Sequence, residues 1–186
     1  MGIKSLIAKL AIKSTGWRAQ NNIGEIPEKC ILCAAPHTSN WDFIIAKLCY
    51  TTVCKQKPNF LIKKEWMKFP MNLILKPLGA IGVDRGKKTS LTESVIAEMN
   101  LRKKFQLAIT PEGTRSKNPN WKRGFWTIAK KCNVPIVIMA IDYKTKTMIL
   151  DHIENLSDNI QSDIQNIKQW YSDNNIVGKH PENFAI

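Results

Sequence analysis

The sequence lacks any long, uninterrupted apolar segment. No stretch of its 186 residues reaches the roughly 18 consecutive apolar residues that a membrane-spanning helix needs. Basic residues are spread through the apolar ones near the N-terminus, and no small-residue cleavage site follows a continuous apolar core. This pattern argues against a secretory signal. We therefore expect a cytoplasmic protein with no transmembrane helix.

Several chemical signatures are also missing. The sequence holds neither the GxxxxGK[ST] of a nucleotide-binding P-loop nor the GxSxG of a serine hydrolase. Its five cysteines are odd in number and lie mostly in apolar runs, which is typical of reduced core thiols. Cys30 and Cys33 form a CxxC, but the two-residue period of a strand turns them to opposite faces. We expect neither a disulfide framework nor a metal site.

Acidic residues are scarce. There are 15 Asp and Glu against 28 Lys and Arg, which gives a net charge of +13. The excess lies in residues 1–150, with 26 basic and 9 acidic side chains, whereas residues 151–186 carry 2 and 6. A positive electrostatic potential of this kind favours binding to nucleic acid, to an anionic membrane surface or to a phosphorylated substrate. Charge alone does not distinguish these partners.

What is present is an alternation of strand-like and helix-like segments. Apolar runs of strand length occur at 29–35, 59–62, 80–84, 105–110, 134–141 and 146–150. Helical periodicity occurs at 41–53, 90–104 and 121–132. We predict one α/β domain over residues 1–186, with a mostly parallel central sheet flanked by helices. An amphipathic helix is expected within 1–20, a motif-bearing core over 30–143, and a C-terminal helix within 155–175, capped by Ser157.

The stretch HTSNWD places His37 and Asp42 where the first predicted strand gives way to a helix. Capping explains Asp42, because the helix dipole favours a carboxylate in the first turn. Capping does not explain His37. Because α/β folds hold reactive groups in loops at strand ends, His37 is a candidate for such a group. A carboxylate that accepts one ring N–H would leave the other nitrogen as a base. Spacing alone keeps both readings open.

Two later loops also carry candidate binding residues. TPEGTRS, from Thr110 to Ser116, follows a buried-type strand and combines a glycine, an arginine and hydroxyls able to hold a phosphate. GAIGVDRGKK places Arg85 and two lysines after another strand. Either arginine alone could be a surface residue in a salt bridge. With His37 also at a strand end, a shared binding edge is favoured.

These stretches resemble the glycerophospholipid acyltransferases, typified by 1-acylglycerol-3-phosphate (lysophosphatidic acid) acyltransferase. HTSNWD matches the family's His-x4-Asp block, and KKEWMKFPMNLILKPLGAIGVDR resembles its second block, which ends in Arg85. PEGTRS matches the third block, and NVPIVIMAID resembles the fourth, with Pro135 in place. The departures are Gly82, Thr110 and Ile138, which bear on pocket shape and leave acyl chain and acceptor open.

The resemblance implies an O-acyltransferase that moves an acyl group from acyl-CoA or acyl carrier protein to a lysolipid hydroxyl. The favoured acceptor is 1-acylglycerol-3-phosphate; a lyso-aminolipid or glycerol 3-phosphate is the alternative. It implies His37 as base and Asp42 as its partner, with no metal and no cofactor beyond the thioester co-substrate. The implied substrate-binding residues are Arg85, Glu112, Gly113, Thr114, Arg115, Lys122 and Pro135.

The N-terminus suggests how such an enzyme would reach a lipid. On a helical wheel, the apolar residues Ile3, Leu6, Ile7, Leu10 and Ala11 share one face, with lysines beside it. This is the pattern of a helix that lies in a membrane interface, although a helix packed on the domain would share it. We expect a peripheral or monotopic enzyme on the cytoplasmic face of an anionic membrane. Nucleic-acid binding without catalysis is the more distant alternative.

Overall fold

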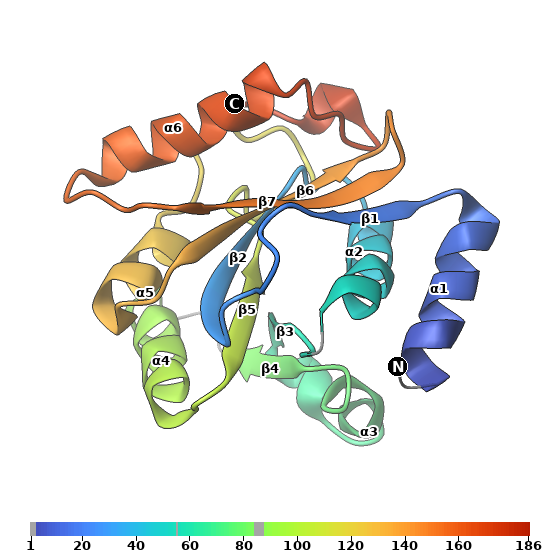
Figure 1. The fold of residues 1–186 in the computed structure, drawn as a ribbon. Helices are drawn as coiled ribbons and strands as arrows, with labels where there is room; N and C mark the ends of the chain where they lie inside the picture. The colour runs from blue at the N-terminus through green and yellow to red at the C-terminus, as the bar shows by residue number, and fades with distance from the viewer. Residues whose placement is uncertain (1–2, 55, 84–87) are drawn as a thin grey trace.

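Seven strands form one sheet in the part of the chain that the computed structural model describes, residues 3–54, 56–83 and 88–186 (Figure 1). The strands are β1 (Arg18–Asn21), β2 (Lys29–Ala35), β3 (Asn59–Lys63), β4 (Ala80–Val83), β5 (Phe105–Ile109), β6 (Ile136–Asp142) and β7 (Thr147–Glu154). Their order across the sheet is β1-β7-β6-β2-β5-β3-β4. All six predicted strands are present.

The sheet is mostly parallel, as predicted. Strand β2 lies at its centre and pairs in parallel with β5 on one side and β6 on the other. The β6–β7 pair is antiparallel. Strand β1 was not predicted, because RAQN has no apolar run; it joins the sheet at the edge, in parallel with β7.

Six α-helices and two short 3-10 helices complete the described fold. They are α1 (Ile3–Thr15), α2 (Asn40–Val53), η1 (Lys64–Met67), α3 (Met71–Leu75), α4 (Lys88–Leu101), α5 (Gly124–Cys132), α6 (Ile160–Asp173) and η2 (Pro181–Asn183). None of the helices described here has both the length and the apolar character that crossing a membrane requires.

The helices cover both faces of the sheet and bury two apolar clusters. Helices α4, α5 and α6 pack on one face, and α1 and α2 on the other (Figure 1). Cys30 belongs to the cluster under α2 and Cys33 to the opposite one, so the CxxC is split between the two faces as expected. All five cysteines are free thiols.

Two predicted helix boundaries were wrong. Helix α6 begins at Ile160, and its cap is Asn159, whose side-chain oxygen accepts the N–H groups of Gln161 and Ser162. The Ser157 hydroxyl instead donates to the Asp163 carboxylate at 2.6 Å. Helix α5 begins at Gly124 rather than near Trp121.

The order of the central strands determines where the loops meet. Strands β5, β2 and β6 are adjacent and parallel, so their carboxyl ends lie at the same edge of the sheet. The loop after β2 holds His37, the loop after β5 holds Glu112, and Tyr143 directly follows β6. Loops at this edge are where open α/β sheets bind their ligands.

Candidate active site

The β2–α2 connection holds His37 and Asp42 against each other. Ser39 is the N-cap of α2; its hydroxyl accepts the Trp41 N–H, and the Asp42 carboxylate accepts the Ser39 N–H. This reciprocal arrangement is a capping box. The Nδ1 atom of His37 lies 3.4 Å from Oδ2 of Asp42. Asp42 therefore caps the helix and also faces the imidazole, so its capping role is compatible with a His37–Asp42 pair.

Asp42 is buried and satisfied on both oxygens. Oδ2 accepts the N–H groups of Thr38 and Ser39, each at 2.8 Å, and Oδ1 accepts the Tyr143 hydroxyl at 2.7 Å. Burial by itself would raise the pKa of Asp42, but the hydrogen bonds from His37, Tyr143 and Ser39 outweigh it and lower the pKa below its ordinary value. The carboxylate is thus held ionised beside the imidazole.

Tyr143 is a site residue that the sequence analysis missed. It lies immediately after β6, and burial together with its bond to Asp42 raises the pKa of its phenol well above the ordinary value. The hydroxyl therefore stays protonated and donates to the carboxylate. The sequence held one usable indication, because Tyr143 directly follows the NVPIVIMAID block, where a strand was expected to end.

Glu112, in the PEGTRS block, contacts the HTSNWD block. Its Oε1 accepts the His37 backbone N–H at 2.7 Å, and its side chain is 1% exposed. Its Oε2 has no hydrogen-bond partner among the described residues. Burial raises the pKa of Glu112 to about 7, although His37 opposes the shift. Glu112, which the resemblance implied as a substrate-binding residue, thus contacts the β2–α2 turn directly.

The loop that carries Glu112 has a fixed backbone. Gly113 has φ +68°, a left-handed conformation that favours glycine, and a Cβ there would lie 3.0 Å from the Lys122 side chain. The Thr114 hydroxyl accepts the Ser116 N–H at 3.2 Å. Arg115 is exposed beside this turn and makes no ion pair among the residues described. Gly113, Thr114, Arg115 and Lys122 therefore lie together in the loop that contacts His37.

One predicted binding residue is not brought to this edge. Pro135 precedes β6, and its carbonyl accepts the Ile31 N–H at 3.0 Å, so it lies toward the opposite end of β6 from Tyr143. Arg85 lies outside the described residues. Within residues 3–54, 56–83 and 88–186, no group of three His, Cys, Asp or Glu side chains could hold a metal ion.

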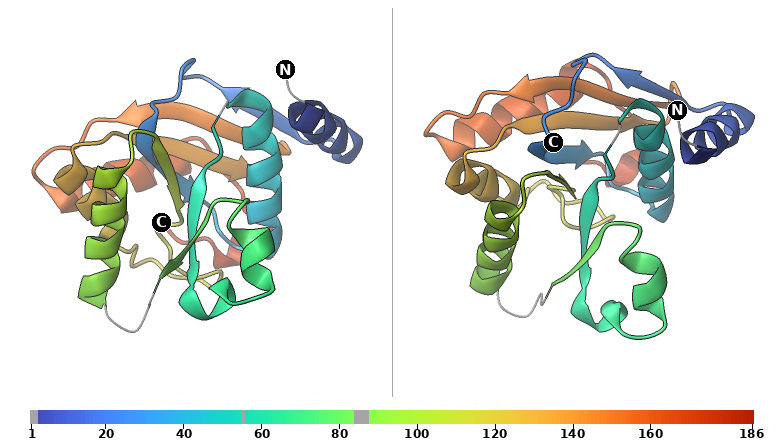
Figure 2. Two further views of the ribbon diagram at one scale, coloured as in Figure 1. Left: turned by 90° about the horizontal axis from the view of Figure 1, so that it is seen from below. Right: turned by 60° about the horizontal axis from the view of Figure 1, so that its bottom comes forward.

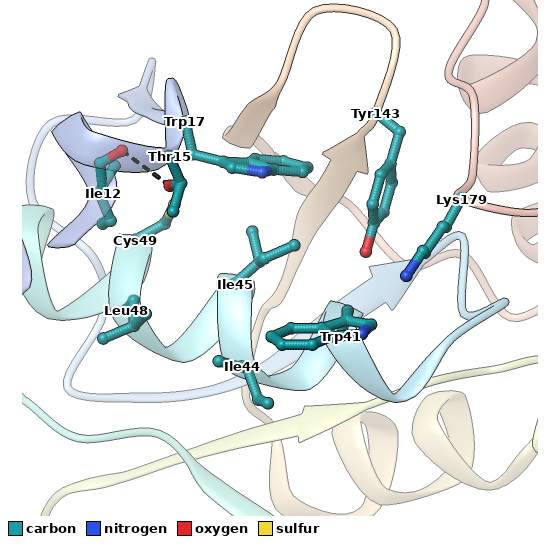
Figure 3. A pocket seen from close by; sticks show the side chains of 10 residues that line it. All are labelled: Ile12, Thr15, Trp17, Trp41, Ile44, Ile45, Leu48, Cys49, Tyr143 and Lys179. Carbon is teal, nitrogen blue, oxygen red and sulfur yellow. Dashed lines mark hydrogen bonds between the residues drawn. The ribbon is translucent and has the colours of Figure 1, made fainter.

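An apolar cavity of about 250 Å³ lies beside the dyad, between α1 and α2 (Figure 3). Its lining residues are Ile12, Thr15, Trp17, Trp41, Ile44, Ile45, Leu48, Cys49, Tyr143 and Lys179. Trp41, Tyr143 and Lys179 gather at one end of it in Figure 3. Tyr143 thus contacts the cavity with its ring and Asp42 with its hydroxyl.

Two comparisons with known proteins found a match. The family model described as Acyltransferase matches residues 18–142, more than half of the chain. Among solved structures, the chain is similar to the 1-acyl-sn-glycerophosphate (LPA) acyltransferase PlsC from Thermotoga maritima, with 16% sequence identity and a TM-score of 0.63. The alignment covers 92% of this chain and 78% of that one. No curated protein matches the sequence.

Proposed function

The chain belongs to the acyltransferase family, and from that premise we propose that it acylates the free hydroxyl of a lysolipid. The favoured acceptor is 1-acylglycerol-3-phosphate, which would give phosphatidic acid. The donor is a fatty acyl thioester, carried by CoA or by acyl carrier protein. The observation that carries the proposal is the His37–Asp42 pair, held at the carboxyl edge of the sheet beside an apolar cavity.

His37 acts as the general base of this reaction. Asp42 faces Nδ1 and favours the tautomer with its proton on that atom, which leaves Nε2 to take the proton of the acceptor hydroxyl. The hydroxyl oxygen bonds to the thioester carbonyl carbon, the carbon–sulfur bond breaks, and the departing thiolate takes the proton from His37. The products are an ester and a free thiol, and this direct attack passes through no covalent acyl-enzyme.

The Glu112 loop supplies groups for the anionic parts of the substrates. Arg115 is exposed and unpaired among the described residues, and a guanidinium can hold two phosphate oxygens at once. Lys122 packs against Gly113 in the same loop and adds a second positive charge. We assign Arg85 to the same phosphate solely because its motif block occurs at the expected place in the sequence. The backbone N–H groups of Thr114 and Arg115 are the candidate donors for the developing oxyanion.

The apolar cavity is suited to a fatty acyl chain. Most of its lining is aliphatic or aromatic; Tyr143 and Lys179 lie at one end, and Thr15 lies toward the other (Figure 3). A chain bound there would extend away from the dyad between α1 and α2. The burial of methylene groups against this lining would favour the bound state by about 0.8 kcal/mol for each fully buried CH₂.

Helix α1 supports peripheral binding to an anionic membrane. It packs on α2 through Ala8 and Ile12, whereas Leu6 and Leu10 are exposed. The side chains of Ile3 and Ile7, which the helical wheel put on the apolar face, lie outside the described set. Exposed leucines on a helix that also carries lysines suit a membrane interface.

A thioester-release assay with several acceptors tests the proposed function. We expect free thiol and acylated product with lysophosphatidate, and slower release with glycerol 3-phosphate or a lyso-aminolipid. Acyl-CoA and acyl carrier protein are compared as donors in parallel. Thiol release at the same slow rate with and without any acceptor would mean hydrolysis instead of acyl transfer.

A further inference from the structure

Residues 63–76 form a small lobe beyond the β3–β4 end of the sheet, which we name the α3 lobe. It contains η1 and α3, and Figure 2 shows it projecting from the edge of the domain, on the side where α2 and α1 stand. Five large apolar side chains of this segment are exposed: Trp66, Phe69, Met71, Leu73 and Ile74. Phe69 is 80% exposed, Leu73 65% and Ile74 60%. Several exposed large apolar side chains within one short segment are typical of an interaction site.

Basic residues accompany these apolar side chains. Lys63, Lys64, Lys68 and Lys76 are all exposed, and Glu65 is the single acidic residue of the segment. The lobe therefore combines aromatic and aliphatic side chains with a net charge of +3. Aromatic residues at the headgroup level and lysines near anionic lipid are what interfacial segments use.

The lobe is anchored to the domain, so its exposed residues are held in a fixed place. A Cβ on Gly82 would lie 2.6 Å from Met67 Cγ, so Met67 of η1 occupies the space above β4 that glycine leaves free. The chain on either side of the lobe is also held to α2. The Lys47 ammonium donates to the Leu78 carbonyl, two residues after the lobe, and Phe43 packs edge-on against Phe60 of β3, three residues before it, with 4.6 Å between ring centroids.

The two helices on the same side of the domain as the lobe also carry exposed apolar residues (Figure 2). They are Trp41 and Ile44 of α2, which also line the apolar cavity, and Leu6 and Leu10 of α1. A partner that reached from the α3 lobe to these helices would cover exposed apolar residues on all three elements. A bilayer surface has that extent.

We propose that the α3 lobe inserts into the interface of an anionic bilayer and acts with α1 to hold the cavity at the lipid surface. The inference rests on the proposed function for its choice of a lipid partner. An acidic carrier protein as the partner of the lobe would account for the lysines. It would not account for the exposure of Phe69, Leu73 and Ile74. Binding should therefore depend on these apolar residues even at high salt, where charge attraction is screened.

Vesicle sedimentation of the full chain tests this proposal. The probe is vesicles of equal parts phosphatidylglycerol and phosphatidylcholine, at low and high salt. We expect the double variant Phe69→Ser/Leu73→Ser to lower the vesicle partition coefficient about tenfold or more, since two largely exposed apolar side chains lose their burial in lipid. Leu101→Ser is the matched control; Leu101 is 82% exposed at the end of α4, which stands on the other side of β4 from the lobe (Figure 1).

A second variant separates charge from insertion. Lys64→Gln/Lys68→Gln alters exposed side chains only and should weaken binding at low salt, with little effect at high salt. Wild-type binding by the Phe69→Ser/Leu73→Ser protein, or equal losses with Leu101→Ser, would overturn the proposal. The proposal would also be overturned if the wild-type chain did not bind vesicles. The same holds if the double variant lost affinity for acyl carrier protein but not for vesicles.

The vesicle measurement needs no catalysis, so it decides the lobe's role even if the proposed reaction fails. Acyl transfer to a short-chain lysophosphatidate dissolved as monomers is measured beside it. We expect the double variant to retain wild-type transfer to this soluble acceptor while it loses transfer to vesicle-embedded acceptor. A wild-type chain that binds vesicles but acylates neither acceptor would refute the proposed function and leave the lobe proposal supported.

Discussion

The hydroxyl of Tyr143 donates to Oδ1 of Asp42 at 2.7 Å, across 101 positions of sequence. The bond exists because β6 lies directly beside β2, so the residue that follows β6 meets the first turn of the helix that follows β2. It gives the carboxylate a third donor, after two backbone N–H groups, and fixes the orientation of the group that faces His37.

Tyr143→Phe should therefore lower turnover more than substrate binding. A hydrogen bond to a charged group contributes about 1.5–3 kcal/mol, so we expect kcat to fall roughly tenfold to a hundredfold with KM little changed. The matched control is Tyr50→Phe, which removes a buried hydroxyl bonded to Gln106 at 2.7 Å, away from the dyad. Equal effects of the two variants on kcat would mean that Tyr143 stabilises the fold without positioning Asp42.

Glu112→Gln should change how stability depends on pH. Burial raises the pKa of Glu112 to about 7 from 4.5, so between these values the folded protein holds a proton that the unfolded chain has released. The free energy of unfolding of the wild type should therefore fall as pH rises through this window. Glutamine keeps an oxygen for the His37 N–H and does not titrate.

We accordingly expect the stability of Glu112→Gln, relative to wild type, to rise by roughly 1–3 kcal/mol between pH 4 and pH 8. Denaturant unfolding at several pH values measures it, with the exposed residue Glu182→Gln as control. A difference between variant and wild type that stays flat across the window would show that Glu112 titrates normally in the folded protein.

Arg115→Lys should separate recognition of the acceptor from chemistry. Lysine keeps the charge but cannot hold two oxygens with one planar group, so KM for a phosphate-bearing acceptor should rise while kcat changes little. Arg102→Lys, at the far end of α4, is the control, because Arg102 pairs with Glu98. Losses of the same size with a phosphate-bearing acceptor and an uncharged one would argue against phosphate recognition by Arg115.

Ile45→Phe should shorten the acyl chains that the enzyme accepts. Ile45 lines the cavity of about 250 Å³, and a larger ring there would take up part of its space (Figure 3). We expect the ratio of kcat/KM for long-chain over short-chain donors to fall about tenfold. Ile153→Phe, on the exposed side of β7, should leave that ratio unchanged. An unchanged ratio in Ile45→Phe would place the acyl chain elsewhere.

The sequence alone pointed to the His37–Asp42 pair, the Glu112 loop and nearly every strand, because each is a local pattern. HTSNWD and PEGTRS are contiguous, and apolar runs mark buried strands wherever these lie in the sheet. Tyr143 was not predicted, because its role depends on the order of the strands in the sheet, which no local pattern encodes. Pro135 belongs to a matching block, but it precedes β6 and therefore lies toward the end of that strand opposite to the His37 site.

The α3 lobe was missed for a related reason. Its segment, MNLIL, has the composition of a buried helix, and composition does not show which apolar residues find partners. In the fold Met67 is seated on β4 at Gly82, while Met71, Leu73 and Ile74 of α3 are exposed. The departure at Gly82 was visible in the sequence, but the side chain that fills its space comes from 15 positions earlier.

The most direct measurement is acyl transfer from labelled acyl-CoA to lysophosphatidate by wild type and by His37→Ala. A positioned base contributes about 10²–10⁴ in rate, so we expect a loss of that size with the fold intact by circular dichroism. His152→Ala is the matched control, because His152 also contacts a carboxylate, Asp151 at 2.8 Å, but lies on β7 outside the site. Near-wild-type transfer by His37→Ala, or an equal loss in His152→Ala, would contradict catalysis by the His37–Asp42 pair.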